Sequence, residues 1–235
     1  MLPPDHESRP RQKEPKPRIY KNPIAFVRTL AQRIGQKNEW ELVIMDAPVL
    51  REYNTFAAIG RLDPDIAIPY LFIDPRLSPP QRTYALTWSL GMIVLTRNFV
   101  DFGEDQREQA SRRFTIAKIN KEVLEDHASM PVEETKRNLP FWASAFAALL
   151  LTDENVYNHY RDQEGMDEHN ACVATAHVCG IPYELVQLWV KLQNVPKDRR
   201  DDLLGMDPRQ WAKDLLGHSF SVKEQKPSLP LKQES

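Results

Sequence analysis

The sequence has 235 residues, 41% of them hydrophobic and 27% charged, with a formal net charge of −2 at pH 7. This composition is typical of a soluble globular protein, and the near-neutral charge excludes a strong overall attraction to nucleic acid or to an anionic membrane. The uncharged runs at 83–96 and 138–152 are shorter than the roughly 20 residues of a membrane-spanning helix. Because no secretory signal is visible and only two cysteines occur, the expected location is the cytoplasm.

The first part of the chain predicts a tail, one helix and several strands. Residues 1–21 are rich in Pro, Lys, Arg and Glu, which predicts a disordered basic tail. A helix is expected from the N-cap Asn22, with Pro23 at its first helical position and Gly35 at its end. Short β-like runs, separated by turn residues, follow at 40–45, 54–62 and 66–74.

The rest of the chain predicts helices. The run at 82–96 forms one helix, the charged segment 98–137 holds a solvated helix around 106–121, and a second uncharged helix spans about 141–152. Short helices are expected over 154–216. The predicted fold class is therefore α+β, with a small antiparallel or mixed sheet packed against several helices. The expected division is an α+β domain over 22–152 with 98–137 as a charged insertion, a helical region over 153–218, and a flexible tail over 219–235.

Three segments carry a resemblance to a known family. The strand, the loop DPRLSPPQR (74–82) and the helix YALTWSLGMIVL (84–95) resemble the ImmA/IrrE family of zinc metallopeptidases, whose active helix has the form RFTLAHELGHLLL. The segment WASAFAALLL (142–151) is similar to the family's EANRFAAELLM helix. The segment ACVATAHVCGIPYELVQLWVKL (171–192) is similar to the helical hairpin that follows it. The resemblance covers roughly residues 23–195 without 98–137, and it implies a metallopeptidase-like core with a C-terminal helical hairpin.

The residues that perform the chemistry in that family are not kept. The resemblance places the two zinc-binding histidines at Trp88 and Met92, the general base at Ser89, and the third ligand at Trp142. An indole only donates hydrogen bonds, a thioether is a poor zinc ligand, and an unactivated serine is no base at neutral pH. We therefore predict a pseudoenzyme with no catalytic residue, no metal and no cofactor. If Trp142 lies on the facing helix, the three bulky side chains fill the place of the metal and its water.

Two other segments contain residue types that bind ligands. His169, Cys172, His177 and Cys179 are zinc-binding types, but on one helix they do not face a single ion, so small buried residues on a core face are the preferred interpretation. The mixed-sign segment KDRRDD (197–202) is expected to be a solvated loop.

The hairpin also fits a helix-turn-helix pattern, with Ala176 four residues before Gly180 and Trp189 nine after it. Residues 162–192 contain five acidic residues, and Lys191 is the single lysine or arginine among them. The resulting negative charge opposes contact with DNA phosphates. Its second helix presents only Glu184 and Gln187 outward. A DNA-binding helix-turn-helix protein is thus an alternative interpretation of the sequence.

The predicted function is that of a non-catalytic regulatory protein that acts by binding another protein. By resemblance, this partner is a repressor, a recombinase or a similar DNA-acting factor in a phage or mobile genetic element, so the process is recombination or the regulation of transcription. Tyr183, Glu184 and Gln187 and the charged segment 98–137 are the expected binding surface, and the basic tail adds weak contact with DNA. A zinc peptidase with relocated ligands, such as His127 or His169, is a further alternative.

Overall fold

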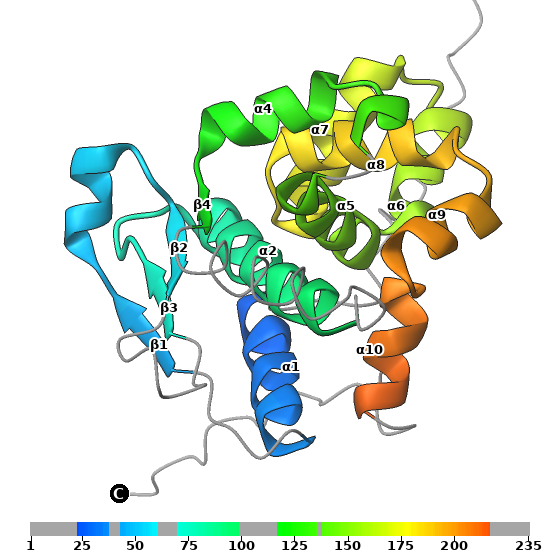
Figure 1. Cartoon of the computed structure of the whole chain (residues 1–235). Helices are drawn as coiled ribbons and strands as arrows, with labels where there is room; N and C mark the ends of the chain where they lie inside the picture. Colours follow the sequence, from blue (N-terminus) through cyan, green and yellow to red (C-terminus); the bar gives the residue numbers. More distant parts are fainter. Residues whose placement is uncertain (1–22, 38–42, 61–69, 99–116, 136–137, 217–235) are drawn as a thin grey trace, which may run out of the picture.

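The structure is a computed structural model that describes residues 23–37, 43–60, 70–98, 117–135 and 138–216 (Figure 1). Both predicted tails, and most of the helix expected around residues 106–121, lie outside the described residues. The described part confirms the α+β fold class, because one small mixed sheet packs against many helices. No helix within it is long and apolar enough to span a bilayer.

Four short strands form the sheet, in the order β1-β3-β2-β4. β3 is parallel to β1 and antiparallel to β2, and β2 is antiparallel to β4. Alternate residues of a strand point to the same face. The buried side chains Ile59, Leu71 and Ile73 therefore belong to the face that meets the helices, whereas Tyr70 and Phe72 stack on the other face. The strands and the 3-10 helix between the first two are β1 (Val43–Asp46), η1 (Pro48–Tyr53), β2 (Ala57–Gly60), β3 (Tyr70–Ile73) and β4 (Ala117–Ile119).

Helix α2 (Pro79–Asn98) is the central element of the fold. At its start the Gln81 side chain accepts from the Ser78 backbone N–H at 3.1 Å, which is one of the two hydrogen bonds of a capping box. The sheet contacts it on one side and α5 (Leu139–Leu151) on another, and α1 (Pro23–Lys37) packs beside it (Figure 1). Residues 83–95 are all buried as a consequence. The uncharged run is thus a helix that is covered on every side.

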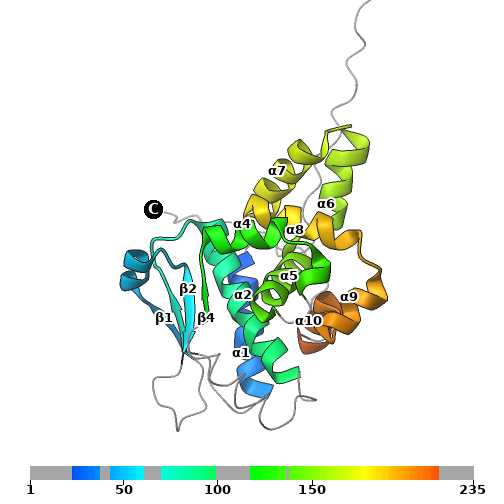
Figure 2. The ribbon, with the colours of Figure 1, turned by 45° about the horizontal axis from the view of Figure 1, so that its top comes forward.

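Helices α4, α8 and α10 pack against α5. α8 packs against α4, α5 and α7, and α10 packs against α1 and α5. Figure 2 shows α6 and α7 on the side of the molecule away from the sheet. A cluster of buried hydrophobic side chains extends from α1 to α10. The elements are α4 (Lys121–Ser129), η2 (Val132–Thr135), α6 (Glu154–Asn158), the π-helix η3 (His159–Gln163), α7 (Glu168–Cys179), α8 (Tyr183–Gln193), α9 (Lys197–Leu204) and α10 (Pro208–Leu216).

Three expected elements differ from the structure. The first helix does not end at Gly35 but continues to Lys37. The last residues of the helix expected around 106–121 form strand β4 instead, because the buried side chain of Ile119 joins the sheet beside β2. The segment 197–202 is not a loop but belongs to α9, where an ion pair of 3.2 Å links Lys197 and Asp201 one turn apart.

Candidate functional site

The three positions on α2 that the resemblance assigns to the reaction centre are buried in the core. Trp88 and Ser89 are 0% exposed and Met92 is 3% exposed. The Trp88 indole Nε1 donates to the Pro140 carbonyl oxygen of α5 at 3.1 Å. The Ser89 hydroxyl donates to the Ala85 carbonyl oxygen of its own helix at 2.8 Å. These positions are therefore occupied by packed and hydrogen-bonded side chains to which a substrate has no access.

The fourth family position, Trp142, lies on α5 but points away from α2. Its indole Nε1 donates to the Thr135 carbonyl oxygen in η2 at 2.9 Å, and its ring meets Phe141 edge to face. Pro140 of α5 contacts α2. Trp142 lies two residues after Pro140, and two residues correspond to a rotation of about 200° around a helix. Among the described residues, no ring contact joins the indoles of Trp88 and Trp142. The two indoles thus fill different parts of the core instead of one shared space.

The close approach of α2 and α5 depends on Gly91. A Cβ atom at this position would lie 3.0 Å from Phe146 Cδ1 and 3.1 Å from the Ala143 carbonyl oxygen. Such distances are tighter than nine in ten contacts of real Cβ atoms, so the neighbouring atoms would have to shift by a few tenths of an ångström. Gly91 therefore marks a point of close approach between the two helices, which is a packing role.

Three polar side chains meet inside this apolar contact, and we call them the Tyr84–Ser144–His127 cluster. Tyr84 Oη and Ser144 Oγ are 2.8 Å apart, and Ser144 Oγ and His127 Nδ1 are also 2.8 Å apart. The residues come from α2, α5 and α4, and each is at most 3% exposed. Because every one of these polar atoms has a partner, the cluster holds three helices together without the cost of an unpaired buried group.

The cluster contains a serine and a histidine at the distance of a nucleophile and its base, but its chemistry is structural. The pKa of His127 is lowered to about 4, chiefly by burial; the nearby Lys191 contributes to this shift, and Asp126 opposes it. A histidine with so low a pKa is a weak base at neutral pH. Burial also raises the pKa of Tyr84 far above its ordinary value, so this hydroxyl stays protonated. Since Ser144 is fully buried, no substrate reaches it.

Lys191 of α8 closes the end of the helix that carries His127. Its ammonium group donates to the carbonyl oxygens of His127, Ala128 and Met130 at the C-terminus of α4. These carbonyls lack helical partners and carry partial negative charge. Burial lowers the pKa of Lys191. The one lysine that the sequence analysis counted in favour of DNA contact is therefore engaged inside the protein.

The candidate metal-binding residues do not converge. His127 belongs to the buried cluster, and His169 Nδ1 lies 2.8 Å from the hydroxyl oxygen of Tyr183. Cys172 and Cys179 are buried, and burial raises the pKa of each thiol to about 11. His177 is on the exposed side of the same helix. Within the described ranges, no three His, Cys, Asp or Glu side chains lie close enough together to hold a metal ion.

The hairpin of α7 and α8 exposes its first helix more than its second. Gly180 has a φ of 65°, which lets the chain turn directly after α7. Helix α8 is enclosed by α4, α5 and α7, and Tyr183, Glu184 and Gln187 are only half-buried. Val173 of α7, in contrast, is 46% exposed. The accessible apolar surface of the hairpin therefore belongs to α7, and the binding surface expected at Tyr183, Glu184 and Gln187 of α8 stays a prediction.

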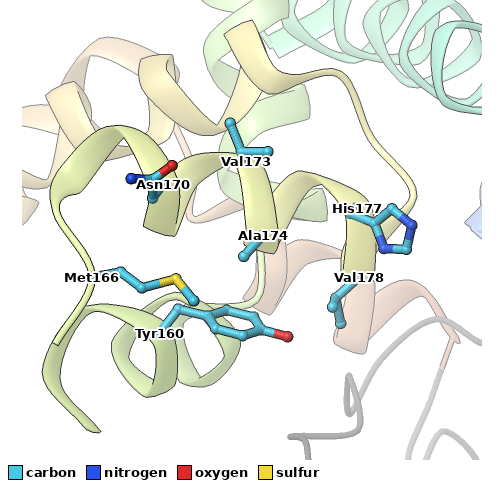
Figure 3. A pocket seen from close by; sticks show the side chains of 7 residues that line it. All are labelled: Tyr160, Met166, Asn170, Val173, Ala174, His177 and Val178. Carbon is cyan, nitrogen blue, oxygen red and sulfur yellow. The ribbon is translucent and has the colours of Figure 1, made fainter. Parts of the chain in front are cut away.

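Beside α7 lies an open groove of about 480 Å³, which we call the α7 groove. Figure 3 shows Tyr160 and Met166 beneath α7, and Ala174 and Val178 on the helix above them. The π-helix η3 supplies Tyr160, and the loop after it supplies Met166. Sequence reasoning missed the groove, although Asn170, Val173, Ala174 and His177 recur at the spacing of one helix face. The lining residues are Tyr160, Met166, Asn170, Val173, Ala174, His177 and Val178.

The sequence and the structure of this chain were compared with those of known proteins. No family model, no curated protein and no solved structure matches the chain.

Proposed function

We propose that this protein is a non-catalytic regulatory protein that acts by binding another protein, and that it is a degenerate relative of the ImmA/IrrE metallopeptidases. One observation carries the proposal. The positions that the resemblance assigns to the reaction centre are all buried in the core, while an open apolar groove lies beside α7. Apolar side chains left exposed in a depression are typical of protein-binding surfaces.

The order of the elements supports the proposed relationship. A strand, β3, leads through the loop at 74–78 into the central helix α2, and α5 lies against α2 as the resemblance requires. The resemblance then implies a repressor, a recombinase or another DNA-acting factor as the partner, in a phage or mobile genetic element. Contact of this protein with nucleic acid is indirect in this proposal.

The environment of α8 favours a protein partner over DNA. A recognition helix must enter the major groove, but three helices enclose α8, and Leu185, Leu188 and Leu192 are 0% exposed. Lys191 is bound to the end of α4. The charges that remain around the hairpin are mainly carboxylates, which repel DNA phosphates.

The test is capture of the partner by the full chain. We expect the immobilised protein to retain one protein from a lysate of its native host after nuclease treatment. The purified partner then forms a complex of fixed stoichiometry with the full chain, measured by size-exclusion chromatography with light scattering. Stoichiometric zinc together with cleavage of the partner contradicts the proposal, as does retention that depends entirely on DNA.

A further inference from the structure

Helix α7 has two faces of different character. Ala171, Cys172, Thr175, Ala176 and Cys179 form a buried face of small side chains. The opposite face lines the α7 groove with Asn170, Val173, Ala174, His177 and Val178. Most of these side chains are apolar, and Val173 is nearly half exposed. Such a face gains stability when a further apolar surface covers it.

The opposite wall of the groove is built by an unusual backbone feature. Helix α6 continues into the π-helix η3, and Tyr160 of η3 lines the groove. The chain after η3 turns at Gly165, and Arg161 Nη1 donates to the Met166 carbonyl oxygen at 2.8 Å, which fixes this turn. π-helices are rare and occur frequently at functional sites. The feature places Tyr160 and Met166 opposite Ala174.

The chain segment that leads from η3 into α7 is mainly acidic. Residues 162–178 contain no lysine and no arginine, and the exposed Arg161 that precedes them donates to the Met166 carbonyl oxygen. Four carboxylate residues of this segment, Asp162, Glu164, Asp167 and Glu168, are exposed. An apolar depression with acidic surroundings favours an apolar segment that carries positive charge, because complementary charges attract the correct partner and exclude others.

We propose that the α7 groove binds a basic amphipathic helix of a partner protein, with the apolar stripe of that helix in the groove and its lysines or arginines beside the carboxylates. The inference rests on the proposed function and specifies the chemistry of the partner segment. The described walls of the groove are helices and one turn, with no strand edge that would pair with an extended peptide. The partner segment must therefore bind through side chains that recur at helical spacing.

The first experiment measures binding of two synthetic helices to the full chain by fluorescence anisotropy. One peptide combines Leu with Lys in amphipathic spacing, and the other replaces each Lys by Glu. We expect the Leu–Lys peptide to bind with an affinity that falls as salt rises, and the Leu–Glu peptide not to bind. Equal binding of both peptides, or binding of neither, overturns the proposal.

Variants locate the peptide on the surface. Val173→Asn and Ala174→Phe are expected to weaken binding of the Leu–Lys peptide by about tenfold or more, because the first removes an apolar contact and the second fills the groove. Val49→Asn is the matched control, since Val49 is 51% exposed on η1 at the sheet. The exposed Val173→Asn variant keeps the test valid if Ala174→Phe does not fold. Unchanged binding by Val173→Asn overturns the proposal.

A second pair of variants tests the charge. Asp162→Asn combined with Glu168→Gln should weaken binding of the Leu–Lys peptide about three- to tenfold. Glu133→Gln combined with Glu134→Gln, two exposed acids on η2, should leave the binding unchanged. Equal effects of both pairs mean that only the net charge matters, and this overturns the proposed site.

Other occupants give distinct results. If removal of residues 1–21 is required before the peptide binds, the groove holds the basic tail of this chain, and the proposal is wrong. If the protein is a dimer and Val173→Asn converts it to a monomer, the groove holds a second copy of this chain, and the proposal is also wrong. A captured partner that binds Val173→Asn as well as wild type removes this inference and leaves the proposed function intact. Capture of no partner removes the proposed function, whatever the peptide does.

Discussion

The contact of α2 with α5 and the α7 groove differ in what they do with polar and apolar side chains. In the first, hydroxyl and imidazole groups are buried, and each has a hydrogen-bond partner, as in the Tyr84–Ser144–His127 cluster. In the second, apolar side chains such as Val173 remain exposed, with carboxylates nearby. Catalytic residue types in the first region serve packing, and plain aliphatic residues in the second are available for binding. Accessibility, and not residue type, separates the two roles.

This comparison predicts that changes in the two regions act on different quantities. Substitutions between α2 and α5 should lower the free energy of unfolding, because they disturb a close-packed interior. Substitutions in the groove should alter binding and leave stability nearly unchanged.

The largest effect is expected for Gly91→Val. The added atoms would meet Phe146 and the backbone of Ala143, and these would have to shift within a close-packed contact, so we expect a loss of about 3 kcal/mol in the free energy of unfolding. Urea denaturation followed by circular dichroism measures it. As a control, Gly165→Ala has no atom near its new Cβ and loses only about 1 kcal/mol, from its positive φ. Equal losses for the two variants would show that α2 and α5 are not in close contact.

The pH dependence of stability should come next in size. The pKa of His127 is lowered to about 4 by burial, whereas the pKa of an unfolded histidine is about 6.5. Neutral His127 therefore stabilises the fold fully above pH 6.5, and this contribution falls as the pH decreases toward 4, by about 2 to 3 kcal/mol. Urea titrations at several pH values measure the slope.

The His127→Gln variant is the control for this slope. The free energy of unfolding of this variant should depend less on pH between 6.5 and 4 than that of the wild type, whatever its absolute value. An identical slope in wild type and variant contradicts burial of a neutral imidazole at this position.

Removal of the central hydroxyl should cost about 2 kcal/mol. Ser144→Ala leaves the buried Tyr84 hydroxyl and His127 Nδ1 without their shared partner. Tyr84→Phe alone should cost about 1 kcal/mol, since Ser144 keeps its contacts with His127 and Pro140. The double variant should lose less than the sum, because no tyrosine hydroxyl is then left unpaired. Strict additivity in this cycle would mean that the two groups do not interact.

The smallest effect on stability is expected in the groove. Val173→Asn should change the free energy of unfolding by no more than about 0.5 kcal/mol, because the side chain is already half in water. The adjacent Cys172 is buried on the other face of α7, so Cys172→Ser should cost about 1 kcal/mol or more. A larger loss for Val173→Asn than for Cys172→Ser would reverse the assignment of the two faces.

Periodicity and local signals predicted much of the fold. The strands near 43–46, 57–60 and 70–73 and the helices α2 and α5 lie where their apolar patterns placed them. Strand β4 was missed because three residues carry no usable pattern, and only pairing with β2 defines it. Short helices were expected over 154–216, but the charges of 197–202 indicated a solvated loop where α9 begins, although one ion pair and a terminal glycine suit a helix.

The candidate site was less predictable than the fold. Trp88, Ser89 and Met92 lie on one buried helix, as expected from their uncharged surroundings. The direction of Trp142 was not predictable, because it depends on which face of α5 meets α2. Tyr84 and Ser144, hydroxyl groups within uncharged runs, were a usable signal for a buried hydrogen bond. Their partner His127 comes from a segment that appeared in the sequence only as charged.

The amino-acid sequence by itself determined the α+β class and the two uncharged helices, because these depend on local composition and spacing. Only the tertiary structure decided which side chains are accessible. Burial depends on neighbours far away in the chain: α5 covers Trp88, α4 supplies His127 to Ser144, and η3 forms the second wall of the α7 groove. A contact between distant segments leaves no periodic trace in either of them.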